Sequence, residues 1–206
     1  FFARSEFGDL GEKSRVERGR FSFKHPFAMS MVSLIKRMVP EQDGEVKGSV
    51  SEKYRDPGEN AKALKSISYL LGSEMTGICE IPEYSWYSNR KDGSEIPYKH
   101  KYAVVMLIDQ GYETMEGASG DDFISGAQSM RAYMRGAEIA GVMAEHLRAN
   151  GFPSRPQTNA DSDVIHTSLV MWAGLGELSR IGEVVLNPFI GPRLKTAVVT
   201  TDMPLA

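Results

Sequence analysis

Apolar residues recur at steps of three and four through residues 121–149, which is the longest regular pattern in the chain. Such steps place side chains on one face of a helix. Asp121 and Asp122 supply negative charge at the start of the pattern, and Asn150-Gly151 supplies a stop at its end. The segment predicts a helix of about 28 residues. Its apolar face consists of Phe123, Ala127, Met130, Met134, Ala137, Val142 and Leu147.

Three shorter segments also have a helical pattern. Residues 28–39 form an amphipathic stretch that stops at Pro40, because proline cannot continue a helix. Residues 59–71 place apolar side chains on one face, and Gly72 is suited to end that helix. Residues 164–180 predict a second, more apolar helix.

Strands are predicted where β-branched and apolar residues dominate, at 76–82, 102–109 and 194–202. The first two are separated by a polar, turn-rich piece and are expected to share one sheet. The rest of the first 55 residues is irregular in pattern, and 41–55 is expected to be a loop or arm. The sequence therefore predicts an α/β (α+β) layered domain, with an N-terminal arm at 1–56 and a core at 57–206.

Composition agrees with a globular protein. The chain has 206 residues, of which 41% are hydrophobic and 25% charged, so it can bury a sizeable core. No apolar run approaches the ~20 residues of a membrane span, so a soluble protein without a membrane span is expected. The N-terminal residues lack the pattern of a signal peptide, which favours a cytoplasmic location over export, with a removed export signal as the alternative.

Charge and cysteine content restrict the chemistry. The net charge of −3 gives no basic excess, so no nucleic-acid partner is expected. Cys79 is the single cysteine, so the chain can form no internal disulfide and no cysteine-ligated iron–sulfur cluster. Because the chain starts at Phe1 rather than methionine and stops at Ala206 just after a predicted strand, we expect a processed or excised piece of a protein.

Common catalytic and cofactor motifs are absent. Gly174-Leu175-Gly176 follows a helix-like run instead of joining a strand to a helix, which argues against a dinucleotide fingerprint. The four histidines have no partner at metal-ligand spacing, so no metal site is predicted. Asp161 and Asp163 precede a predicted helix and are interpreted as N-capping residues. The nucleophile elbow G-x-S-x-G does not occur.

The order of several motifs, however, resembles the reductive dehalogenase family of cobalamin-dependent iron–sulfur enzymes. The residues that carry the resemblance are AGLGELSRIGEVVLNPFIGPRLKTAVVTTDMPL, together with MRAYMRGAEIAGVMAEHLRANGFPSRPQTN and ISYLLGSEMTGICEI upstream. They cover roughly residues 60–205. Two positions depart from the family pattern, since Ile181 replaces an asparagine and Asn187 replaces a threonine before proline.

The resemblance implies a nitroreductase-like core that holds a base-off corrinoid (cobalamin). In that family the cobalt is reduced to Co(I) by two 4Fe–4S clusters, whose cysteine motifs would begin shortly after this chain ends. We therefore expect the clusters, and the path to the electron donor, in an absent C-terminal domain. The substrate implied is a small halogenated organic compound, for which a halophenol is one candidate.

By motif position, the family's proton-donating tyrosine matches Tyr133 and its basic partner matches Lys195. A neighbouring ammonium would lower the pKa of a tyrosine from its ordinary value of about 10, which would make Tyr133 a better acid. Taken without the resemblance, Tyr133 reads as a buried helix tyrosine and Lys195 as a solvated lysine at a strand edge.

Weaker assignments complete the expected site. Asn159, Trp86 and Tyr87 are candidates to bind the substrate, although Asn159 is equally a turn former. The expected contacts to the corrinoid are Met130, Asn187, Phe189 and Gly191; core packing is an equal interpretation for Met130.

Three functions are consistent with the sequence. The chain is the cobalamin-binding, substrate-holding part of a reductive dehalogenase, or a corrinoid-binding or processing module that works without clusters, or a vestigial duplicate domain without catalysis. The presence of both Tyr133 and Lys195 favours the first.

Overall fold

A four-stranded antiparallel sheet forms the centre of the protein, in the order β1-β2-β6-β3. The computed structural model describes residues 2–23, 25–90, 92–119 and 122–206. The strands are β1 (Met75–Glu80), β2 (Tyr102–Asp109), β3 (Ser154–Gln157) and β6 (Leu194–Thr201). The three predicted strands are thus confirmed. The fourth, β3, was not predicted because SRPQ carries no strand pattern; its Pro156 is tolerated because β3 is an edge strand.

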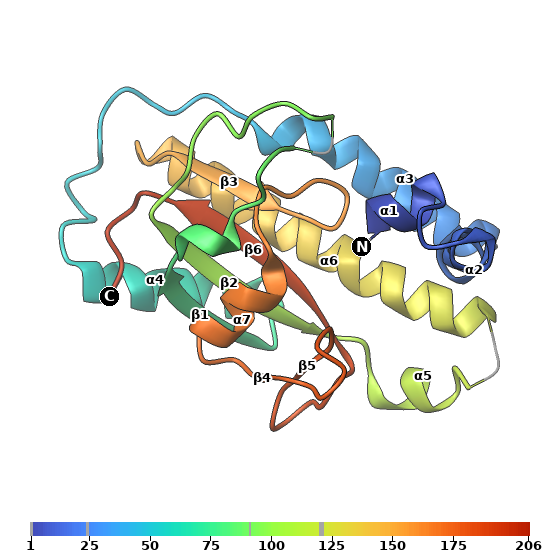
Figure 1. Ribbon diagram of the computed structural model, residues 1–206. Coiled ribbons are helices and arrows are strands. Elements are labelled where there is room, and N and C mark those ends of the chain that lie inside the picture. Colours follow the sequence, from blue (N-terminus) through green and yellow to red (C-terminus); the bar gives the residue numbers. More distant parts are fainter. Residues whose placement is uncertain (1, 24, 91, 120–121) are drawn as a thin grey trace.

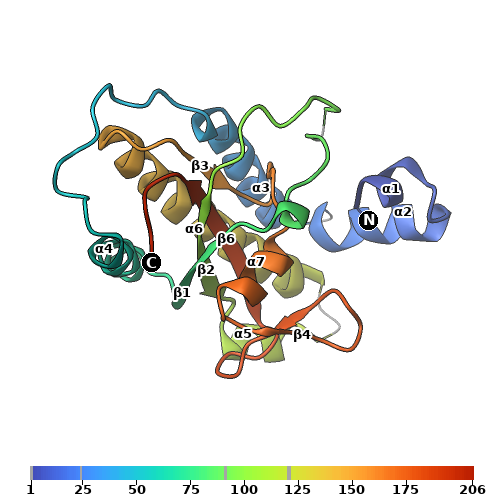
Figure 2. The same cartoon turned by 60° about the vertical axis from the view of Figure 1, so that its left-hand side comes forward.

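Helices cover both faces of this sheet (Figure 1). On one face, α4 (Pro57–Leu70) and α6 (Asp122–Ala149) bury a core with Val104, Met106 and Ile108 of β2. On the other face, α7 (His166–Trp172) packs with the short strands β4 (Glu177–Leu178) and β5 (Val185–Leu186) and the turn η2 (Glu83–Ser85). Figure 2 shows the sheet edge-on between these layers. The structure is therefore a mixed helix and antiparallel-sheet fold.

The predicted long helix is confirmed as α6, with 28 residues. Most of its apolar positions face the core, but Phe123 and Val142 are exposed. Gly136 brings the helix close to the sheet, because a Cβ atom there would lie only 3.0 Å from the Cβ of Ala197 on β6. Gly151 ends the segment with a φ of 88°, as the sequence predicted.

The predicted helix over residues 164–180 is shorter than expected. It ends at Trp172, because Gly174 adopts a φ of 70° and Gly176 lies against Leu186. A Cβ atom at Gly176 would lie 2.7 Å from the Leu186 carbonyl oxygen, so this glycine is required for the close approach of the β4–β5 hairpin. The apolar pattern continues into that hairpin because the hairpin packs on the same core as α7.

The N-terminal region contains more helix than the sequence indicated. It forms α1 (Phe2–Phe7), α2 (Glu12–Phe23), α3 (Pro26–Met38) and the 3₁₀ turn η1 (Val39–Gln42), and α3 lies along α6 (Figure 1). Only α3 was predicted, because α2 is charged and has almost no apolar face. A further short helix, α5 (Tyr112–Glu116), follows β2. Among the described residues, no helix is sufficiently long and apolar to cross a membrane.

Candidate active site

Tyr133 and Lys195, assigned from distant parts of the sequence, lie side by side in the structure. Tyr133 is in the first half of α6, and Lys195 is the second residue of β6. The Lys195 Nζ atom lies 5.0 Å from the centroid of the Tyr133 ring. The contact follows from the close packing at Gly136 and Ala197, which come one helical turn after Tyr133 and two residues after Lys195. The helix–sheet junction therefore creates this pair.

Tyr133 also packs against a small apolar cluster between α3 and α6. The buried members are Ala28, Met31, Val32 and Met130. Met130 is only 5% exposed, and its contacts are with this cluster. The structure thus places Met130 next to Tyr133 in the core, in line with the packing interpretation of this methionine.

Burial controls the protonation of both site residues. It raises the pKa of the Tyr133 phenol and lowers the pKa of the Lys195 ammonium, since each charged form loses solvation. Burial therefore opposes the lowering of the Tyr133 pKa that the sequence-based hypothesis expects from Lys195, whose Nζ lies over the ring. At neutral pH Tyr133 keeps its proton, as a proton donor must before reaction.

The loop before β6 presents an exposed aromatic side chain on a backbone that is held by hydrogen bonds. Asn187 is buried; its Oδ1 accepts hydrogen bonds from the backbone N–H groups of Phe189 (2.9 Å) and Ile190 (3.1 Å), and its Nδ2 donates to the carbonyl oxygen of Leu175 (2.7 Å). Asn187 and Gly191 also exchange backbone hydrogen bonds. Phe189 is 79% exposed. Asn187 therefore shapes the loop from inside, whereas Phe189 is available for contact.

The apolar cluster that packs against Tyr133 includes none of the three candidate substrate residues. Trp86 is buried among the residues of the α7 face of the sheet, whereas Tyr133 is on the α6 face. Tyr87 is exposed, and its backbone N–H donates to the carbonyl oxygen of Asp163. Asn159 is exposed in the loop that follows β3. Their assignment as substrate-binding residues remains a prediction.

Asp161 and Asp163 do not cap a helix, contrary to the sequence-based interpretation. The N-cap of α7 is Ile165, without a side-chain hydrogen bond. Both carboxylates instead bind Arg155 of β3, at 2.6 Å from Asp161 and 3.2 Å from Asp163. Charge neutralisation of a buried arginine outweighs capping here. In the described parts of the chain, no group of three or more His, Cys, Asp or Glu side chains is arranged to hold a metal ion.

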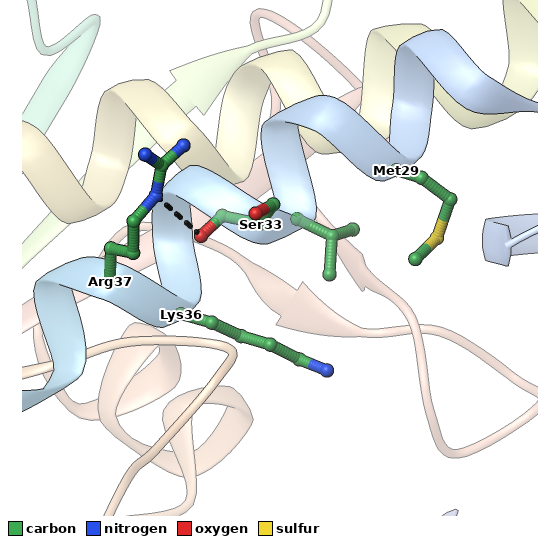
Figure 3. A pocket seen from close by; sticks show the side chains of 5 residues that line it. Met29, Ser33, Lys36 and Arg37 are labelled. Carbon is green, nitrogen blue, oxygen red and sulfur yellow. Dashed lines mark hydrogen bonds between the residues drawn. The ribbon is translucent and has the colours of Figure 1, made fainter.

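A hollow of about 350 Å³ lies on the outer surface of α3, lined by Met29, Val32, Ser33, Lys36 and Arg37 (Figure 3). The Arg37 Nε donates a hydrogen bond to the carbonyl oxygen of Ser33, one turn earlier. All lining residues belong to a single helix, so the hollow does not bring together groups from different elements. We do not place the chemistry there.

His166 at the start of α7 connects the loop containing Asn159 to the strand containing Lys195. Its Nε2 lies 3.2 Å from Ser162 Oγ and its Nδ1 lies 2.9 Å from Thr196 Oγ1. Burial lowers the pKa of His166 to about 4, so the ring is neutral at pH 7.

This pKa predicts a pH dependence of stability. As the pH falls below the ordinary histidine pKa of about 6.5, His166 is protonated in the unfolded chain. In the folded chain it stays neutral until about pH 4, so protonation favours the unfolded state. The free energy of unfolding should therefore decrease by about 3 kcal/mol more in the wild type than in His166→Gln across this interval. Urea unfolding of both chains between pH 7 and pH 4 measures the difference; parallel curves would contradict the prediction.

Comparison with solved structures decides the family. Structures of the catabolic reductive dehalogenase NpRdhA match the chain at 55% sequence identity and a TM-score of 0.91. The match covers 100% of this chain and 30% of the NpRdhA chain. The chain belongs to the reductive dehalogenase family. The sequence-based resemblance is thus confirmed, and the chain spans less than a third of the length of the relative that it matches.

Two further structures add what these dehalogenases bind. NpRdhA in complex with 3-bromo-4-hydroxybenzoic acid matches with the same identity, coverage and TM-score of 0.91. So does a reductive dehalogenase structure that suggests a mechanism for B12-dependent dehalogenation. The sequence matches no protein-family model, and no curated protein matches it.

Within this reductive dehalogenase segment, sequence reasoning missed the polar groups around the start of β6. Arg193 forms a bidentate ion pair with Asp109 at the end of β2, with distances of 3.0 and 3.3 Å. Its guanidinium also lies 5.7 Å from the ring centroid of Tyr112. Gln110 follows Asp109 and is buried against α6. The only available signal was the cluster of polar residues directly after a strongly apolar strand.

Proposed function

We propose that the chain forms the cobalamin-binding, substrate-holding part of a reductive dehalogenase that removes halide from an aromatic organohalide. The observation that carries the proposal is the contact between Tyr133 and Lys195, a proton donor and a cation, at the junction of α6 and β6. The family relationship supports it. A halophenol is the proposed substrate type, because NpRdhA binds a bromohydroxybenzoate.

The loop before β6 fits a large flat cofactor. Phe189 exposes apolar surface in this loop, Ile181 does so in the neighbouring turn between β4 and β5, and Asn187 fixes the loop backbone from inside without being exposed itself. We assign Phe189 and Gly191 to contact the corrinoid, and Asn187 to hold the loop that presents them. When bound, the corrinoid would supply the reduced cobalt that drives removal of the halide, with electrons from iron–sulfur clusters outside this chain.

Tyr133 would then deliver the proton that replaces the halogen on the substrate carbon. Its phenol is protonated at neutral pH because burial raises its pKa. Lys195, when protonated, would stabilise the phenolate left behind or the phenolate oxygen of the substrate, since it approaches over the ring of Tyr133. Both side chains are partly buried, and electrostatic effects are stronger there than in water.

Corrinoid binding tests the proposal. Titration of the polypeptide that carries these residues with cob(II)alamin should give the absorption spectrum of a bound base-off form. Phe189→Asp should weaken binding about ten-fold or more, because it places a charge where an apolar surface is buried. Phe7→Asp is the control, since Phe7 is equally exposed (84%) but lies on α1.

Two outcomes would count against this assignment. The absence of a bound spectrum would refute corrinoid binding, and equal effects of Phe189→Asp and Phe7→Asp would refute the role of the loop. Binding without dehalogenation of any halophenol would favour the alternative of a corrinoid-binding or processing module.

A further inference from the structure

Gln110, between β2 and α5, makes polar contacts with the two elements that carry Tyr133 and Lys195. It is only 3% exposed. A buried glutamine needs hydrogen-bond partners for its side-chain amide as well as for its backbone N–H and carbonyl groups. The hydrogen bonds of Gln110 connect α6 to the start of β6.

The backbone of Gln110 joins β2 to β6. Its N–H donates to the carbonyl oxygen of Arg193 at 2.9 Å, directly before the strand on which Lys195 lies. Lys195 pairs with Ile108 in the β2–β6 register, so Gln110 is two residues further along the same face as the lysine.

The side chain of Gln110 joins the same point to α6. Its Nε2 donates to Ser129 Oγ at 3.1 Å, and Ser129 is also only 3% exposed. Ser129 precedes Tyr133 by four residues, so both lie on one face of the helix. The Gln110 carbonyl oxygen accepts a further bond from Arg131 of α6, at 2.9 Å from its Nη2.

From this arrangement we propose that Gln110 is a positioning residue, which sets the separation of Tyr133 and Lys195 by tying α6 to the start of β6. The role rests on the proposed function of that pair. Gly136 permits the close approach of helix and strand, and the Gln110–Ser129 hydrogen bond fixes the position of the helix along the strand. A small shift between a proton donor and its partner is costly in rate, while substrate affinity depends less on it.

The test compares Gln110→Met with Gln128→Met in the cofactor-loaded enzyme, with a brominated 4-hydroxybenzoate as substrate. Gln128 is a second buried glutamine near this end of the sheet; its Nε2 faces Met115 Sδ instead of the site. We expect Gln110→Met to lower kcat about ten-fold, the equivalent of one hydrogen bond, with KM within two-fold of the wild type. Gln128→Met should leave kcat unchanged, and it should not lower the melting temperature, because Gln128 Oε1 is buried without a hydrogen-bond partner.

Ser129→Ala removes the other partner of the hydrogen bond and covers the case in which Gln110→Met does not fold. It should lower kcat by a similar factor, and the double variant should be no slower than either single one, because both remove the same bond. Equal kcat for wild type, Gln110→Met and Ser129→Ala would overturn the inference. A wild-type enzyme that binds cobalamin but does not dehalogenate would instead refute the proposed function itself.

Discussion

Replacement of Tyr133 by phenylalanine should lower kcat for dehalogenation at least a hundred-fold while leaving cobalamin binding unchanged. The variant removes a single oxygen, and with it the proton that, in the proposed function, Tyr133 delivers to the substrate carbon. The ring remains to pack on the α3–α6 cluster and to contact the Lys195 Nζ, 5.0 Å from its centroid. The measurement is single-turnover dehalogenation of a halophenol in the polypeptide that carries this chain, with the corrinoid spectrum recorded in parallel.

The protein contains a matched control for this substitution. Lys101 Nζ also lies 5.0 Å from the centroid of a tyrosine ring, that of Tyr102, at the opposite end of β2 from Gln110. Tyr102→Phe removes the same oxygen from the same type of pair and should leave kcat unchanged. Full activity of Tyr133→Phe would exclude Tyr133 as the proton donor, and a similar loss in Tyr102→Phe would show that the effect is not specific to the site.

Local sequence patterns predicted the elements that are buried on both sides or strongly periodic. The strands β1, β2 and β6 and the helices α3, α4 and α6 are of this kind, because apolar spacing and punctuating glycines and prolines determine them. The edge strand β3 and the β4–β5 hairpin lack such patterns. Pairing with a neighbouring strand defines both, and the buried side chains of β3 are mostly polar residues held by distant partners, such as the aspartates that bind Arg155.

The candidate site shows a similar division. Tyr133 and Lys195 were found from family motifs, and no spacing rule alone would have joined residues of α6 and β6. The contacts of Gln110 depend on strand register and helix position, which one sequence does not reveal. The direction of the Tyr133 pKa shift also depends on burial, which here opposes the effect expected from a nearby cation.

A buried ion cluster supports the loop that contains Asn159. The Arg155 guanidinium, 6% exposed, contacts Asp43 at 3.0 Å, Asp161 at 2.6 Å and Asp163 at 3.2 Å. It therefore joins the end of η1, through Asp43 and Gln42, and the loop after β3 to the sheet. Arg90 provides a second cation for Asp163, at 3.1 Å.

Arg155→Met should consequently destabilise the chain by about 3–5 kcal/mol, because Asp163 stays buried with one cation fewer. Arg55→Met is the control: Arg55 pairs with Glu52 at 3.1 Å but is exposed, so its loss should change the free energy of unfolding by less than about 0.5 kcal/mol. Urea unfolding at pH 7 measures both. Adding Asp163→Asn to Arg155→Met should recover part of the stability, since it removes the charge left without its partner. Equal stability of Arg155→Met and Arg55→Met would mean that Arg90 alone neutralises Asp163, and that the arginine of β3 does not hold the loop.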